Sequence, residues 1–178
     1  MTQLEVIERI LEENYIHPEQ GKLIEEDTDV KGNKFKVEYK IISNLKLEYK
    51  LYRYDDKIFP FFSEGVPALK KMCDYILFCQ DNRWLFVFII ELKLGTESAG
   101  KQLNAAEIFI EFIINSAKRI GEPITNIDIR KIRISDRKIR IRQKQSIKSK
   151  QDYFDFDSNK YLDYRLDKLY LQPLTQLL

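Results

Sequence analysis

Residues 84–94 are apolar on both faces of the strand that they would form, and this run constrains the fold more than any other part of the chain. A strand that is apolar on both sides belongs at the centre of a sheet whose two faces are covered. Residues 73–79 form a second apolar run, and the polar residues 80–83 between the two runs predict a turn. The sequence therefore predicts an antiparallel hairpin inside a covered β-sheet.

Further strands are predicted before and after this hairpin. Residues 35–54 alternate between apolar and polar side chains and indicate one or two strands with a break near Ser43, whereas residues 18–33 have the composition of a loop. After the hairpin, residues 127–134 and 138–142 alternate isoleucine with arginine or lysine, which predicts two more strands.

Two helices complete the predicted order. Apolar residues recur at helical spacing over residues 2–15, where Thr2 and Glu5 have the spacing of a capping box. A longer helix is predicted over residues 99–120, ended by Gly121. The order helix, strand, strand, strand, helix, strand predicts an α/β fold with a mixed central β-sheet flanked by helices.

The 178 residues are enough for one domain, and no internal repeat or linker rich in glycine or proline divides them. We expect a single domain over residues 1–178, with its core over about residues 1–145 and a helical tail over residues 153–178. Within the tail, a short helix over about residues 159–170 is expected to dock on the core.

The sequence also excludes several classes of protein. The longest uncharged apolar run spans residues 84–90, far short of the roughly 20 residues that cross a bilayer. The N-terminus lacks the basic and apolar segments of a signal peptide, so we expect a cytoplasmic protein with no membrane partner. Two cysteines and one histidine, His17, are too few for a zinc cluster of cysteine and histidine.

Three charged side chains interrupt the apolar hairpin: Asp74, Glu91 and Lys93. Charges inside a sheet are costly unless they are paired or bind a metal. If residues 81 and 82 form the turn, Asp74 lies opposite Ile89 and on the same face of the sheet as Glu91 and Lys93. Asp74 and Glu91 are then diagonal neighbours, whose side chains can converge.

The converging carboxylates of Asp74 and Glu91 would make a site of hard oxygen ligands, which Mg²⁺ and Mn²⁺ prefer. The backbone carbonyl of Leu92 could complete the ligand set. Lys93 could orient or deprotonate a water, or stabilise a developing negative charge. Carboxylates, a divalent ion and an adjacent lysine are the parts needed to hydrolyse a phosphodiester.

Gln102 is predicted near the middle of the apolar face of the following helix, at its start. There it would point toward the sheet near residues 91–93 and could hydrogen-bond a phosphate, a metal-bound water or Lys93. The alternative is that the first helical turn overhangs the core and leaves Gln102 in water.

The spacing of these residues resembles that of the PD-(D/E)xK nuclease superfamily. Asp74 is followed, after sixteen intervening residues, by Glu-Leu-Lys at residues 91–93 and then by a helix that carries Gln102. The predicted order of elements is also that of the superfamily's core, over about residues 1–145. One departure is that Cys73, not proline, precedes Asp74.

The resemblance implies a restriction-endonuclease-like fold and a metal-dependent nuclease that hydrolyses phosphodiester bonds of nucleic acid, with DNA as the expected substrate. It implies that Asp74 and Glu91 hold Mg²⁺ or Mn²⁺, that Lys93 is the catalytic lysine, and that Gln102 corresponds to a glutamine that some members carry. Many members also use an acid from the first helix. The acids that could join the site here are Glu8, Glu12 and Glu64.

Basic residues gather in residues 127–150, which hold ten lysines and arginines and two aspartates, a net charge of +8 against +2 for the whole chain. Such a strip on a nearly neutral protein suggests a surface that faces a polyanion. The alternative is a solvated hairpin with no such partner. The side chains expected along a phosphate backbone are Arg130, Arg133, Arg137, Lys138, Arg140, Arg142 and Lys144.

Two other functions fit the same sequence. A nuclease fold that has lost its chemistry could act as a nucleic-acid-binding module, in which Asp74, Glu91 and Lys93 form a structural ion-pair cluster. The basic hairpin could instead meet an acidic protein partner. The sequence leaves open which nucleic acid is bound and whether the chain works as a homodimer.

Overall fold

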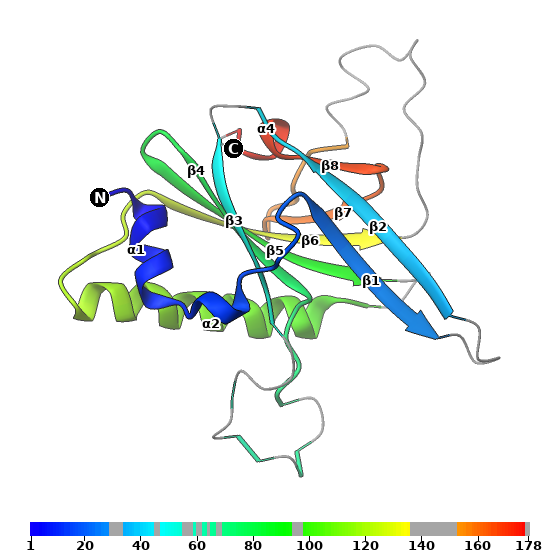
Figure 1. The fold of residues 1–178 in the computed structure, drawn as a ribbon, viewed down its shortest axis with the longest axis horizontal. Helices are drawn as coiled ribbons and strands as arrows, with labels where there is room; N and C mark the ends of the chain where they lie inside the picture. The colour runs from blue at the N-terminus through cyan, green and yellow to red at the C-terminus, as the bar shows by residue number, and fades with distance from the viewer. Residues whose placement is uncertain are drawn as a thin grey trace.

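Two mixed β-sheets and three α-helices make up the part of the chain that the computed structural model describes (Figure 1). The described residues are 1–28, 34–44, 47–54, 59, 62–63, 65–66, 69–93, 98–135 and 153–176. This architecture confirms the predicted α/β class and a mixed sheet, whereas the second sheet is not among the predicted elements. None of the helices in these segments is long and apolar enough to cross a membrane.

The larger sheet has five strands in the order β3, β4, β5, β6, β7. Their bounds are Glu48–Arg53, Tyr75–Asp81, Trp84–Lys93, Ile127–Ser135 and Tyr161–Tyr164. The first three strands run antiparallel, whereas β5, β6 and β7 run parallel. Because parallel neighbours need a crossover connection, helix α2 (Gly100–Arg119) follows β5 and precedes β6.

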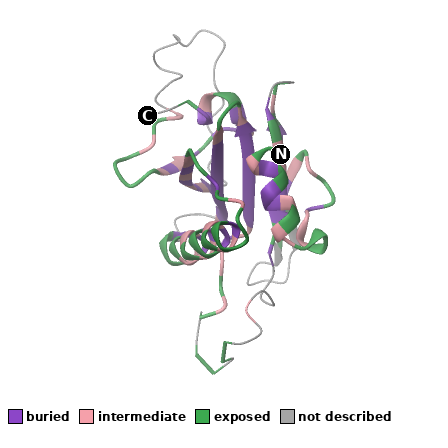
Figure 2. Ribbon diagram, turned by 90° about the vertical axis from the view of Figure 1, so that its left-hand side faces the viewer, coloured by how far each residue is buried: buried purple, intermediate pink, exposed green. Residues whose placement is uncertain are grey.

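The predicted hairpin is confirmed as β4 and β5, at the centre of this sheet. Six of the seven residues of β4 and eight of the ten of β5 are buried, and the buried residues in Figure 2 lie along these central strands. Helices α1 and α2 contribute to the core on one face of the sheet, and the smaller sheet contributes to the core on the other. Both faces are therefore covered, as the apolar pattern required.

The smaller sheet consists of β1 (Lys22–Thr28), β2 (Lys34–Ile42) and β8 (Lys168–Tyr170), with β2 in the middle. The expectation of a loop over residues 18–33 is wrong, because β1 pairs along its whole length with β2. β1 is an edge strand in which three of seven side chains are acidic, so it lacks the apolar alternation by which strands are recognised.

The first helix, α1, spans Gln3–Ile10 and is shorter than the predicted residues 2–15. Its capping box is confirmed, since Thr2 Oγ1 accepts from the Glu5 N–H and the Glu5 carboxylate accepts from the Thr2 N–H. A separate 3₁₀ helix, Glu13–Tyr15, follows it. Helix α2 agrees with its prediction to one residue at each end, and Gly121 after it takes the left-handed φ of 83° that favours glycine.

The helix predicted over residues 159–170 is wrong. Strands β7 and β8 occupy this segment, and the only helix among the described tail residues is the four-residue α4, Leu171–Leu174. Leu162, Tyr164 and Leu166 are buried at a spacing of two residues, which is the period of a strand. The tail therefore supplies an edge strand to each of the two sheets.

Candidate active site

Asp74 and Glu91 lie side by side on neighbouring strands. β4 pairs with β5 from Tyr75 opposite Ile90, so Asp74, the residue before β4, lies across from Glu91. The Asp74 N–H donates a hydrogen bond to Glu91 Oε2 at 3.2 Å, and the Leu92 N–H donates one to Asp74 Oδ2 at 2.7 Å. The structure thus brings together the two carboxylates that the sequence paired.

The register of this hairpin differs from the predicted one by two residues. The turn consists of Asn82 and Arg83, one position later than assumed, and Asn82 takes a left-handed φ of 51°. The predicted partner of Asp74, Ile89, is therefore wrong. Because side chains alternate between faces with a period of two, this shift leaves each one on its predicted face.

Lys93 completes the cluster. Its Nζ lies 2.7 Å from Glu91 Oε1, and the exposed fractions of the two side chains are 16% and 3%. Burial and the neighbouring Asp74 carboxylate, opposed by Lys93, raise the pKa of Glu91 to about 7. Burial also raises the pKa of Asp74, against the Leu92 N–H and the positive charge of Lys93. Glu91 is buried and Asp74 is half-buried, and the positive charges near them are Lys93 for both and Arg53 for Asp74. A carboxylate whose pKa is raised in this way is stabilised when a proton or another cation binds beside it.

The donor set fits a hard divalent ion. Mg²⁺ is commonly held by one or two carboxylates and completes its shell with carbonyl oxygens, waters and substrate phosphates. The N–H of Leu92 points toward Asp74, and in a strand the carbonyl of the same residue points to the same side. The described residues contain no group of three or more acidic, histidine or cysteine side chains that could hold a metal. Asp74, Glu91 and the Leu92 carbonyl are the groups that would hold such an ion.

Gln102 lies at the margin of the buried face of α2, not in its middle as predicted. It is half-buried and lies about 60° around the helix from the centre of that face. Gln102 is two turns before Phe109, whose ring packs against Tyr54 at the end of β3. Because Tyr54 follows Arg53, which pairs with Tyr75, the side of α2 that carries Gln102 and Phe109 is the side nearer to Asp74. The side chains that form the buried face are Leu103, Ala106, Ile110, Ile113 and Ala117.

The additional acids considered from the sequence do not join the described cluster. Glu8 forms an ion pair with Lys50 at 2.7 Å, and Lys50 lies opposite Phe78 in the middle of β4, away from Asp74. Glu12 is exposed after the end of α1. Glu64 lies outside the described residues.

Arg133 and Asp163 continue the row of charged residues across the sheet. Glu91 pairs with Arg133 on β6, and Arg133 pairs with Asp163 on β7. Arg133 Nη1 donates to Asp163 Oδ1 at 2.8 Å, and Arg165 donates to Asp163 Oδ2. Sequence reasoning missed Asp163 because a helix was expected there, and residues 161–164 do not alternate clearly between apolar and polar side chains.

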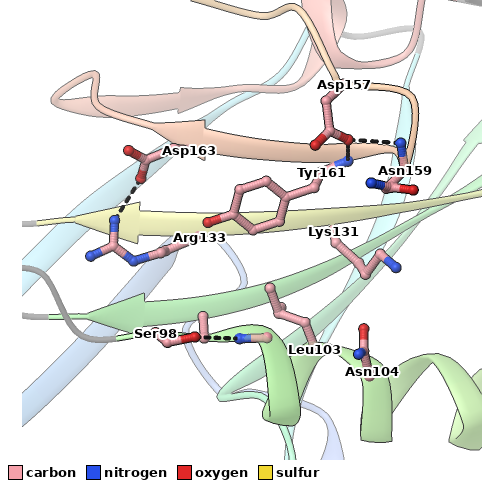
Figure 3. A pocket seen from close by; sticks show the side chains of 11 residues that line it. Ser98, Leu103, Asn104, Lys131, Arg133, Asp157, Asn159, Tyr161 and Asp163 are labelled. Atoms are coloured by element: carbon pink, nitrogen blue, oxygen red, sulfur yellow. Dashed lines mark hydrogen bonds and ion pairs between the residues drawn. The ribbon is translucent and has the colours of Figure 1, made fainter.

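A pocket of about 700 Å³ adjoins this row (Figure 3). Lys131 and Arg133 line it from β6, and Tyr161 and Asp163 line it from β7. The start of α2 forms the opposite wall. Arg133 thus connects the carboxylate cluster with the pocket, because it neighbours Glu91 in the sheet and also faces the cavity.

The prediction that Arg130 contacts nucleic acid is wrong. Arg130 is 1% exposed and donates hydrogen bonds to Asp128 and to the backbone carbonyls of Leu174 and Gln176. Strand alternation turns it to the face opposite Arg133, where the C-terminal segment covers it. The other candidates on this strip, together with the predicted strand over 138–142, lie outside the described residues: Arg137, Lys138, Arg140, Arg142 and Lys144.

Comparison of the chain with models of protein families, with curated proteins and with solved structures finds no match. The candidate site therefore rests on the geometry of its own residues.

Proposed function

We propose that this chain is a metal-dependent nuclease that hydrolyses phosphodiester bonds of nucleic acid, with DNA as the expected substrate. The observation that carries the proposal is the convergence of Asp74, Glu91 and Lys93 on two buried central strands. Charged groups are costly at such a position, and two carboxylates with one lysine have the composition of a site for phosphodiester hydrolysis.

The order of the elements supports the same proposal. The antiparallel strands β3, β4 and β5 are followed by α2 and by β6, which runs parallel to β5, and α1 precedes them all. This is the order expected of a restriction-endonuclease-like core. The strands β1, β2, β7 and β8 are additional to it.

Each residue of the site has a role in this proposal. Asp74, Glu91 and the Leu92 carbonyl hold Mg²⁺ or Mn²⁺, which supplies Lewis acidity and an activated water when bound. Lys93, held by Glu91, orients that water or stabilises negative charge on the phosphate oxygens. Gln102, on the side of α2 nearer to Asp74, hydrogen-bonds the phosphate or a water.

The remaining basic residues supply affinity in this proposal. Arg133 faces the site, and the basic residues beyond β6 add sequence-independent contacts to the phosphate backbone, which weaken as salt is raised. Their contribution positions the strand and carries no sequence information.

The second candidate function is a nucleic-acid-binding module without catalysis. It is favoured by one observation: the hydrogen-bonding groups of the protein already engage both carboxylates, through Lys93 and through two backbone N–H groups. In that case the cluster is a structural ion pair.

Metal-dependent cleavage separates the two functions. Plasmid, linear and single-stranded DNA are incubated with the wild-type protein in Mg²⁺, in Mn²⁺ and in chelator. We expect cleavage in either metal, none in chelator, and none by Asp74→Ala or Lys93→Ala. Asp81→Ala, which removes an acid from the far end of the same strand, is the matched control and should cut at the wild-type rate.

DNA that is retarded on a gel but not cut in any metal would support the binding module. Cleavage by either site variant at the wild-type rate would show that the site lies elsewhere. Circular dichroism of the variants establishes that they are folded before either conclusion is drawn.

A further inference from the structure

The pocket beside the carboxylates presents the groups that recognise a nucleotide. The Tyr161 ring lies between Arg133 and Lys131, which both come from β6, and Asn104 lies on the opposite wall, on α2 (Figure 3). Aromatic rings stack on bases, and cationic side chains contact phosphates, so together they bind single-stranded nucleic acid. The volume of about 700 Å³ lies within the range of small-molecule sites.

The cations of the pocket are held in place by ion pairs, and Asp157 and Asp163 also line the cavity. Lys131 Nζ lies 3.0 Å from Glu107, which reaches across from α2. Arg133 shares the Asp163 carboxylate with Arg165, at 2.8 Å and 2.6 Å. If Arg133 turns to a phosphate, Asp163 therefore keeps Arg165 as a cationic partner.

The pocket lies close to the proposed reaction centre. Arg133 pairs with Glu91 on the adjacent strand, which places their backbones about 5 Å apart. Tyr161 pairs with Lys131, two residues before Arg133 on β6. A phosphate held by Arg133 would therefore lie next to the carboxylates, while a base over Tyr161 lies further along the same face of the sheet.

We propose that this pocket binds the nucleotide next to the phosphate that is cut, turned out of the base stack, with its base against Tyr161 and its phosphate at Arg133. This inference rests on the proposed nuclease function for the reaction that follows binding. It assigns the substrate class: a single strand, a strand end or a distorted duplex supplies such a nucleotide at low cost, whereas a regular duplex must first be unpaired.

The test is a double-mutant cycle between the protein and the strand. A short fluorescein-labelled single-stranded DNA is prepared intact and with one abasic site at each position in turn. Its affinity for wild type, Tyr161→Ala and Tyr161→Phe is measured by anisotropy in chelator, so that no cleavage occurs. We expect Tyr161→Ala to weaken binding of the intact strand by about ten-fold, the effect of losing one base–aromatic stack.

The decisive expectation is that Tyr161→Ala and the abasic site are energetically coupled at one position of the strand. The strand that is abasic there should bind wild type and Tyr161→Ala equally, because the stacked base is already absent. Tyr161→Phe keeps the ring and should bind every strand as wild type does. Asn104→Ala, on the other wall of the pocket, should weaken the intact strand without altering the fold, since Asn104 is exposed on α2.

If the losses of affinity from Tyr161→Ala and from the abasic site simply add at every position of the strand, the pocket is not a base site. That result together with metal-dependent cleavage by wild type would leave the nuclease proposal standing. Coupling at one position without cleavage in any metal would instead retain the pocket and reject the nuclease.

Discussion

Two clusters of acids and bases lie on opposite faces of the five-stranded sheet, and they differ in the direction in which the pKa of their acids is shifted. In the first, Asp128 forms ion pairs with Arg130 and Lys160. Burial would raise the pKa of Asp128, but these two cations lower it. In the second, Glu91 pairs with Lys93 and lies beside Asp74, and the pKa of Glu91 rises to about 7. The cations of the first cluster keep Asp128 ionised, whereas Glu91 in the second is only partly ionised at neutral pH.

The comparison also separates a buried structural arginine, Arg130, from Arg133, which lines the pocket. Arg130 lies between the rings of Phe86 and Phe156 at 5.1 Å and 4.9 Å and fastens the C-terminal segment to the sheet. Arg133, three residues later, is on the other face beside the carboxylates. A count of basic residues in a strand therefore does not identify those that meet a ligand.

The largest expected effect on stability comes from breaking the cluster of Asp128, Arg130 and Lys160. Arg130→Met should lower the free energy of unfolding by about 3–5 kcal/mol, because it removes one partner of a buried ion pair and leaves the carbonyls of Leu174 and Gln176 without their donor. Urea unfolding measures the loss. Arg83→Met, in the exposed turn, is the control and should change stability by less than about 0.5 kcal/mol. A similarly small change for Arg130→Met would show that the cluster is not structural.

The two clusters should respond to pH in opposite directions. The folded-state pKa of Glu91 lies above its unfolded value of 4.5, so the folded state binds the proton more tightly and stability falls as pH rises from 4.5 to about 7. The pKa of Asp128 is depressed below 3.8, so its contribution is present at neutral pH and is lost only as pH falls below that value.

This difference predicts the behaviour of Glu91→Gln. Between about pH 5 and about pH 8 in metal-free buffer, the wild-type protein should lose on the order of 2–3 kcal/mol more stability than the variant. Asp74 contributes in the same direction, since its pKa is also raised. Urea unfolding at the two pH values checks this expectation. Equal pH dependence of the two proteins would contradict the shift at Glu91.

The affinity for metal should follow the titration of Glu91. Because a carboxylate binds metal in its ionised form, Mn²⁺ affinity should rise by up to about ten-fold per pH unit below pH 7 and level off above it. Calorimetry in buffers of different ionisation enthalpy would measure the proton released. Asp74→Ala should abolish the binding and Asp81→Asn should leave it unchanged. Binding that does not vary with pH would place the ion away from Glu91.

The sequence predicted the central hairpin and the positions of Asp74 and Glu91 well, for a specific reason. An apolar pattern on both faces fixed the central hairpin, and the period of two kept Asp74 and Glu91 on one face although the turn was misplaced. The pattern of β6 was not sufficient, because each of its faces carries both isoleucine and charged residues. Only the position of the C-terminal segment decides that Arg130 is buried and that Arg133 faces the site.

The strands β1, β7 and β8 were missed for a related reason. β1 is acidic, and β7 and β8 are short and lie in a segment of mixed charge, so none carries a strong local signal. Their pairing depends on partners that are distant in the sequence, such as β2 with β8. Asp163 and Tyr161, which complete the row and the pocket, could not be assigned before that pairing was known.

The smallest expected effect on stability comes from Arg133. Arg133→Gln should change the free energy of unfolding by about 1 kcal/mol or less, because Asp163 keeps Arg165 and the pair is partly solvated. Its effect on DNA should be clearer: the dependence of affinity on salt should weaken by about 0.7–0.9 in the logarithmic slope, as for one lost phosphate contact. Anisotropy in chelator over a series of salt concentrations measures the slope. A stability loss as large as that of Arg130→Met with an unchanged slope would make Arg133 structural too, and the two faces of β6 would no longer differ in role.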